Sequence, residues 1–99
     1  MPTFLFFGSD GPGGMEIRAR VQPDHRAYIR IAQPGCRLIS AGPLVDDSGE
    51  RMNGTFLAFE ADDRAAVERF VAGDPYAKEG LFERTEIRRI NWTVGKPGD

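Results

Sequence analysis

The sequence predicts an α+β domain in which two helices cover one face of a four-stranded antiparallel sheet. Three observations support this prediction. Short apolar runs typical of strands and segments of helical period follow one another in the order βαββαβ. The connections between them are short, and right-handed crossovers then give the split βαβ topology of ferredoxin-like sheets. The chain has 99 residues, 40% of them hydrophobic, which is enough for one core. We expect a single domain over residues 1–95 and a flexible tail over 96–99.

The composition argues against several classes of protein. The formal net charge is −2, which is not the basic footprint of a nucleic-acid-binding protein. The single cysteine, Cys36, cannot form an internal disulfide. No apolar run approaches the ~20 residues of a membrane span, and the N-terminus lacks the basic start of a signal peptide. We therefore expect a cytoplasmic protein without nucleic-acid or membrane partners.

The first strand is expected over residues 3–7, which are bulky and mostly aromatic, with Gly8 at its end. Residues 8–14 form a glycine-rich connection between this strand and a helix. Such a loop can cradle phosphate, but the glycine spacing matches no phosphate-binding motif and Pro12 lacks an amide hydrogen. We interpret the segment as a flexible connector.

The next segment has a helical pattern that Pro23 interrupts. A proline inside a helix costs about 3 kcal/mol, so we expect a short helix over residues 15–21 and a second one over 23–32. His25 would then lie near a helix N-terminus, where the dipole disfavours its cationic form. Tyr28, Ile29 and Ala32 follow at helical spacing and share its face.

Two further strands are expected over residues 37–41, ended by Gly42 and Pro43, and over residues 54–60. The polar residues 46–50 form the hairpin between them. The strands at 3–7 and 54–60 are apolar on both faces, whereas two helices cover only one face of the sheet. The second face should therefore be covered by the same face of another copy, giving a two-fold dimer with sheets back to back. A partner protein or a ligand is the alternative cover.

The C-terminal part predicts a helix over residues 64–72, with Asp62 or Asp63 as its cap. Gly73 should end this helix in the left-handed conformation, and Asp74 should be extended because a proline follows it. A turn at 77–80 leads into a last strand over residues 84–94. The apolar positions in that strand depart from strict alternation, which predicts a bulge or bend near residues 87–90.

His25 is the side chain best suited to acid–base chemistry, because histidine alone titrates near neutral pH without perturbation. Asp74, at the far end of the second helix, can reach it if the two helices lie side by side. The pair would then make a general base whose free nitrogen faces a pocket. The alternative is that His25 only packs and that Asp74 only caps a turn.

Other reactive groups are sparse. Arg18 could hold an anionic substrate group or be a solvated helix arginine, and Ser40 could donate a hydrogen bond to a ligand but has no triad partners. Cys36 has no base beside it and is interpreted as structural. One histidine and one cysteine give no metal-ligand spacing, haem binding has no support, and we expect neither a metal nor a cofactor.

Several motifs together resemble the YCII-related family over nearly the whole chain. They are Arg18, Pro23-Asp24-His25, Ala41-Gly42-Pro43, Gly54, and Asp74-Pro75-Tyr76 followed by Gly80-Leu81. The resemblance implies a ferredoxin-like subunit assembled as a dimeric α+β barrel, with an acid–base dyad that maps onto His25 and Asp74. It also implies a pocket, which we expect Arg18, Ser40, Gly42, Pro43 and Tyr76 to shape.

The chain departs from the family pattern next to the dyad. Family members often carry Arg three residues before the histidine, where this chain has Gln22, and Leu after it, where this chain has Arg26. The first change puts the family's anion binding in doubt. Three hypotheses follow: an enzyme for proton abstraction or elimination on a small organic acid or ring compound, a non-catalytic small-molecule binder or accessory subunit, and a structural dimer.

Overall fold

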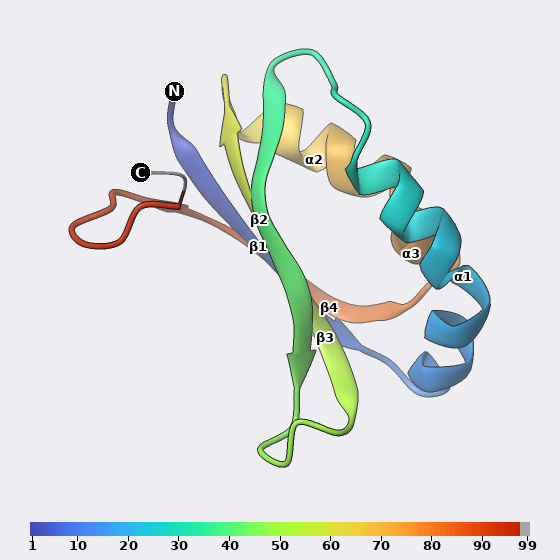
Figure 1. Cartoon of the computed structure of the whole chain (residues 1–99). Coiled ribbons are helices and arrows are strands. Elements are labelled where there is room, and N and C mark those ends of the chain that lie inside the picture. The colour runs from blue at the N-terminus through green and yellow to red at the C-terminus, as the bar shows by residue number, and fades with distance from the viewer. Residues whose placement is uncertain (98–99) are drawn as a thin grey trace.

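The computed structural model describes residues 1–97, which form a sheet covered on one side by helices (Figure 1). The sheet order is β2-β3-β1-β4, and all neighbouring strands are antiparallel. The predicted ferredoxin-like α+β class is confirmed, with one additional short helix, α3. The elements are β1 (Thr3–Asp10), α1 (Gly14–Ile29), β2 (Cys36–Val45), β3 (Met52–Ala61), α2 (Arg64–Gly73), α3 (Pro75–Lys78) and β4 (Phe82–Ile90).

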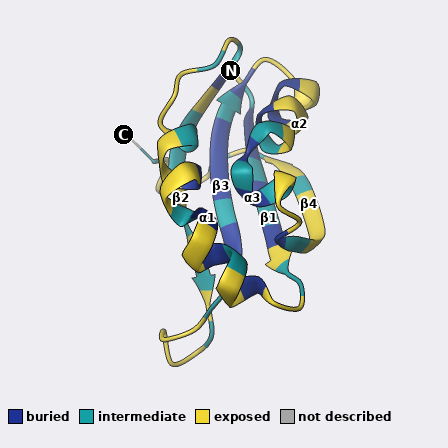
Figure 2. Ribbon diagram, turned by 90° about the vertical axis from the view of Figure 1, so that its right-hand side faces the viewer, coloured by how far each residue is buried: buried dark blue, intermediate teal, exposed yellow. Residues whose placement is uncertain are grey.

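The core lies between the helices and the two central strands. Phe4 and Phe6 of β1 pair with Phe59 and Leu57 of β3, and all four side chains are buried. Figure 2 shows dark blue along the central strands and yellow on the outer faces of the helices. Phe4 and Phe6 are two residues apart in β1 and both face the core, as predicted for a strand in which every second residue faces the same side.

The helix predicted in two pieces is one continuous helix, α1, so this prediction was wrong. Pro23 lies inside it on the exposed face, while Val21 and His25 on either side are buried. Packing of the inner face therefore outweighs the local cost of the proline. As a consequence His25 lies in the last third of a 16-residue helix, away from the N-terminal dipole.

Two strands continue through residues that were expected to end them. β1 runs on to Asp10, because Gly8 serves close packing: a Cβ there would lie 2.6 Å from the Phe82 ring. β2 passes through Gly42 and Pro43, which an edge strand tolerates because its outer N–H groups need no ladder partner.

The end of α2 also differs from the prediction. Gly73 is the last helical residue and has no positive φ. A Cβ on it would lie 2.4 Å from the hydroxyl of Tyr28, which donates a 2.7 Å hydrogen bond to the carbonyl of Phe70. Glycine is therefore required by the close approach of α1. The Asp63 cap and the extended Asp74 are confirmed.

The last strand ends at Ile90, before the predicted residue 94. Its irregularity lies near Phe82 and Arg84, opposite the end of β1, rather than at residues 87–90. The bulge therefore occurs where β1 turns toward α1 and not where the apolar pattern changes phase.

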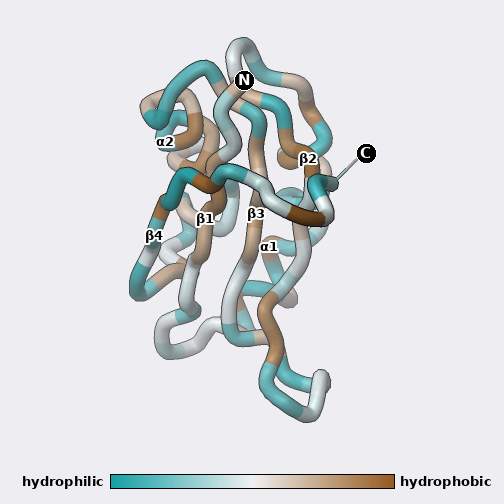
Figure 3. The backbone as a smooth tube through the Cα atoms, turned by 90° about the vertical axis from the view of Figure 1, so that its left-hand side faces the viewer, coloured by the Kyte–Doolittle hydropathy of each residue, from teal (hydrophilic) through white to brown (hydrophobic). Residues whose placement is uncertain are grey.

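The face of the sheet opposite the helices is partly covered by the chain itself. Segment 91–97 crosses this face (Figure 3), where Trp92 donates a 3.2 Å hydrogen bond to Thr3 Oγ1 and Lys96 lies 3.6 Å from Glu60. Leu5 and Phe7 remain half-buried there. The predicted tail 96–99 falls partly on residues 98–99, which lie outside the described residues.

Within residues 1–97, no helix has both the length and the apolar character needed to cross a membrane.

Candidate functional site

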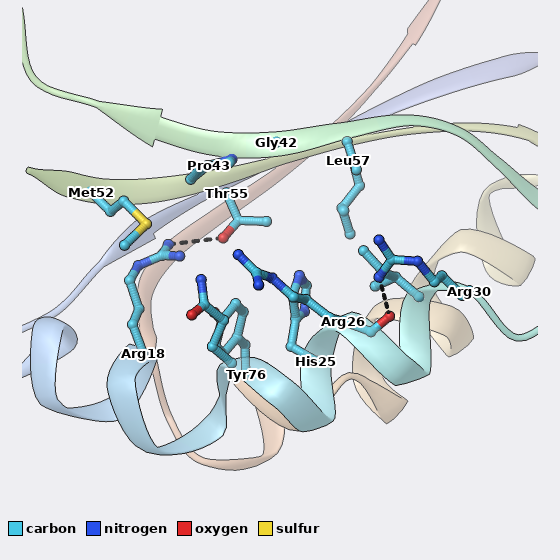
Figure 4. Close-up of a pocket in the computed structure, with 13 residues that line it drawn as sticks. Arg18, His25, Arg26, Arg30, Gly42, Pro43, Met52, Thr55, Leu57 and Tyr76 are labelled. Carbon is cyan, nitrogen blue, oxygen red and sulfur yellow. Dashed lines mark hydrogen bonds between the residues drawn. The ribbon is translucent and has the colours of Figure 1, made fainter. Parts of the chain in front are cut away.

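A cavity of about 350 Å³ opens between α1 and the strands β2 and β3 (Figure 4). Tyr76 of α3 closes one side of it. Leu57 and Ile29 give the cavity an apolar surface, while His25 and three arginines bring polar groups. The residues that line it are Arg18, Gln22, His25, Arg26, Ile29, Arg30, Ala41, Gly42, Pro43, Met52, Thr55, Leu57 and Tyr76.

His25 and Asp74 meet at the edge of this cavity. The Nδ1 atom of His25 lies 2.8 Å from Oδ1 and 2.9 Å from Oδ2 of Asp74. His25 projects from the inner face of α1, and Asp74 both follows α2 and caps α3. Asp74 is only 1% exposed, and its Oδ1 also accepts a 2.9 Å hydrogen bond from the backbone N–H of Tyr76. The carboxylate is therefore fixed by the turn and by the imidazole together.

The hydrogen bond to Asp74 decides which nitrogen of neutral His25 carries the proton. A carboxylate only accepts, so Nδ1 is the donor and Nε2 carries the lone pair. Nε2 has no hydrogen-bond partner within residues 1–97. Every fully buried side-chain nitrogen in that range has a partner, so the unpaired Nε2 must be accessible to solvent. The ring thus presents a basic atom that the cavity can reach.

Tyr76 holds the other side of the imidazole. Its ring stacks on His25 with centroids 4.0 Å apart and planes at 17°, and the Arg18 guanidinium lies 5.1 Å from the Tyr76 centroid. Burial raises the pKa of the Tyr76 hydroxyl, and the nearby Arg18 charge opposes part of that rise. The tyrosine therefore stays neutral and shapes the site as a flat wall.

Arg18 lines the cavity but is already engaged. Its Nε and Nη2 donate 2.6 Å and 2.9 Å hydrogen bonds to the two oxygens of Asp10. Nη2 also lies 2.6 Å from the Gly54 carbonyl and 2.9 Å from Thr55 Oγ1. The side chain is 3% exposed, so it is not a solvated arginine, and its charge is balanced by Asp10. It joins the start of α1 to β1 and β3.

The remaining predicted pocket residues divide into two groups. Gly42 and Pro43 line the cavity, as does Tyr76. Ser40 does not line it, because a bulge at residue 39 turns Ser40 to the opposite face, where it pairs with Ala58. The expectation for Ser40 was therefore wrong.

Cys36 is 5% exposed, and burial raises the pKa of its thiol to about 11, which fits a structural cysteine. Within residues 1–97, no three potential metal ligands among His, Cys, Asp and Glu lie close enough to hold an ion together.

The sequence reasoning missed the arginines beside the dyad as pocket residues. Gln22 and Arg26 of α1 and the C-cap residue Arg30 recur every four residues and all line the cavity. This spacing was visible in the sequence. Arg26 and Arg30 both fall in the helix that was expected over residues 23–32, and the expected break at Pro23 separated only Gln22 from them.

Comparison with known proteins agrees with this fold. The sequence model of the YCII-related domain matches residues 3–91. The chain belongs to the YCII-related domain family. Protein YciI of Escherichia coli O6:H1 is 23% identical over 90 residues, which cover 86% of this chain and 92% of that protein.

Two solved structures extend the family comparison. A 5-chloro-2-hydroxyhydroquinone dehydrochlorinase from Burkholderia phenoliruptrix AC1100, in complex with 2,5-dihydroxybenzoquinone, is 30% identical with a TM-score of 0.76. That match covers 94% of this chain and 95% of the other. A dimeric ferredoxin-like protein from Jannaschia sp. CCS1 shares the fold alone, at 14% identity and a TM-score of 0.52, covering 93% of this chain and 100% of the other. Relatives of this chain therefore include a small-molecule enzyme.

Proposed function

We propose that this protein is an enzyme that removes a proton from a hydroxylated ring compound and promotes elimination of a leaving group from it. The base is His25, and Asp74 orients it. The observation that supports this assignment is the His25 ring, which is bound through Nδ1 to a buried carboxylate and offers Nε2 to a cavity. The dehydrochlorinase at 30% identity supports the substrate class.

The chemistry follows from the charges of the pair. When an O–H or C–H bond of the substrate breaks, a new N–H bond forms at Nε2 of His25, and the electron pair stays on the ring. The Asp74 carboxylate stabilises the resulting imidazolium. The electron pair on the ring takes up a proton at the ring carbon that bears the chlorine, so that a C–H bond forms there. Loss of a second hydroxyl proton then expels chloride with the electron pair of the C–Cl bond. The net loss of one proton and one chloride converts a chlorinated hydroxyhydroquinone into a hydroxyquinone without an external oxidant.

The cavity suits a flat ring. Leu57 and Ile29 supply apolar contacts, and Gly42 contributes backbone without a side chain that would narrow the space. Tyr76 stacks on the base and keeps it from rotating away. A ring held between these groups would lie within reach of Nε2.

Chloride release from 5-chloro-2-hydroxyhydroquinone tests the proposal directly. We expect release that is proportional to the concentration of protein, saturates with substrate and exceeds the spontaneous rate. Ion chromatography of timed samples measures it. Saturable binding of 2,5-dihydroxybenzoquinone without chloride release would contradict the enzyme proposal and favour a non-catalytic binding protein.

We further propose that two copies pair through the sheet face opposite the helices. Leu5, Phe7 and Phe56 lie half-buried there, with the rings of Phe7 and Phe56 5.5 Å apart. Apolar residues on this face favour burial against a second sheet. The dimeric Jannaschia protein of the same fold supports this assembly.

Replacing Phe7 with glutamate should convert the dimer into a monomer, because the charge would be buried in the interface. Multi-angle light scattering after size exclusion gives the mass. Ile31→Glu is the matched control, since Ile31 is 60% exposed and lies just beyond the end of α1 rather than on a strand. A wild-type mass near 11 kDa, that of one chain, would contradict the dimer.

A further inference from the structure

The cavity carries an unbalanced positive charge at one end. Its lining contains three arginines and His25 but no aspartate or glutamate. Asp10 balances Arg18, whereas no carboxylate within residues 1–97 lies in an ion pair with Arg26 or Arg30. The positive charge that remains therefore belongs to Arg26 and Arg30.

Both side chains are placed to act on a molecule in the cavity. Arg26 directly follows the base His25, and Arg30 lies about 6 Å further along the axis of the helix. In Figure 4 both side chains lie in the space between α1 and the strands, with the guanidinium of Arg26 directed toward Arg18 and that of Arg30 directed back toward Arg26. Arg30 donates a 2.8 Å hydrogen bond to the backbone carbonyl of Arg26, a neutral acceptor that orients the guanidinium and leaves its charge uncompensated.

The opposite end of the cavity offers no comparable group. Gln22 lines the cavity one turn before Arg26 and is neutral, and Arg18 beyond it is bound to Asp10. A ring with a negative substituent would therefore have one preferred orientation, with that substituent toward Arg30 and the ring over His25. Gln22 is neutral, whereas Arg26 and Arg30 place positive charge about one and two helical turns later on the same side.

We infer that Arg26 and Arg30 form a carboxylate subsite, so that the substrate is a hydroxylated ring that bears a carboxylate. The planar forks of two guanidinium groups match the geometry of a carboxylate. This inference rests on the proposed function for the ring and the base, and it adds the identity and position of the charged substituent. One of the two residues, Arg26, is a departure from the family pattern, in which leucine often follows the histidine.

The test compares two probes that differ only in the carboxylate, 2,5-dihydroxybenzoate and hydroquinone. Isothermal titration calorimetry at low salt should show that the wild-type protein binds 2,5-dihydroxybenzoate at least about tenfold more tightly. Arg26→Gln and Arg30→Gln should each lower that affinity roughly tenfold, as expected for loss of a charge-assisted hydrogen bond. The affinity for hydroquinone should stay within about twofold, because that probe has no charged group to lose.

Arg20→Gln is the matched control. It removes the same charge from the same helix, but Arg20 pairs with Glu79 and does not line the cavity. Its affinity for both probes should equal that of the wild type. If only the total charge of the helix mattered, Arg20→Gln, Arg26→Gln and Arg30→Gln would all lower the affinity for 2,5-dihydroxybenzoate by the same factor.

Three results would overturn the subsite: equal binding of both probes by the wild type, failure of 2,5-dihydroxybenzoate to bind, or equal loss for both probes in the arginine variants. The proposed function fails separately. Chloride release by the wild type, together with an unchanged affinity of Arg26→Gln and Arg30→Gln for 2,5-dihydroxybenzoate, would preserve the enzyme and remove the subsite. Arginine-dependent binding with no elimination on any chlorinated hydroxy ring would do the reverse.

Discussion

Replacing His25 with asparagine should lower kcat about 10²- to 10⁴-fold while the protein remains folded. The asparagine amide can still donate a hydrogen bond to Asp74 in place of Nδ1, so the buried carboxylate keeps a partner. The variant has no atom at the position of Nε2, and the substrate proton then has no acceptor. Initial rates of chloride release measure kcat, and a urea titration measures the free energy of unfolding.

The Asp74→Asn variant separates orientation of the base from its presence. The asparagine oxygen can still accept the backbone N–H of Tyr76, while its amide would donate to Nδ1 of His25. This reverses the tautomer and places the proton on Nε2, so we expect a fall in kcat that approaches that of His25→Asn. Asp24→Asn is the control, because Asp24 is exposed beside His25 in the sequence and does not line the cavity.

Equal kcat in the wild type, His25→Asn and Asp74→Asn would contradict the catalytic role. If both variants instead lost stability without a change in the kcat of the folded fraction, the pair would be structural. The two measurements together therefore distinguish the enzyme from a protein in which the dyad only holds α1 against α3.

Replacing Asp10 with alanine should destabilise the protein by about 3–5 kcal/mol. Arg18 and Asp10 are 3% and 8% exposed, and their two hydrogen bonds join α1 to the end of β1. Loss of one partner leaves a buried guanidinium without its counter-charge, which costs far more than loss of an exposed pair. Chemical denaturation with urea gives the change in the free energy of unfolding.

Arg37→Ala is the control for that measurement. Arg37 pairs with Glu60, but its side chain is 73% exposed and solvent screens the interaction. We expect an unchanged denaturation midpoint. A similar loss in both variants would show that burial does not decide the strength of these ion pairs, and a negligible loss in Asp10→Ala would show that Thr55 and the Gly54 carbonyl alone hold Arg18.

The order of the elements, the cap at Asp63 and the extended conformation of Asp74 were predictable because they depend on local signals. Aromatic alternation marks the strands, an aspartate before a helical run marks the cap at Asp63, and proline after Asp74 makes that residue extended. The residues alone left the pairing of His25 with Asp74 as one of two alternatives, and the resemblance to the YCII-related family favoured it. Nothing in the spacing of two residues 49 positions apart fixes a contact between them.

The sequence by itself determined an α+β chain with an apolar sheet, one titratable histidine and one carboxylate held by a stiff turn. Tertiary structure decided the rest, because packing energy overrides local preference. The helix α1 continues through Pro23, and the Tyr28 hydroxyl occupies the space that a side chain at position 73 would need. Arg18 turns inward to Asp10. That continuous helix also places Arg26 and Arg30 at the cavity. A contact between distant segments depends on the burial of many side chains from all parts of the chain, so it cannot be read from any short stretch of sequence.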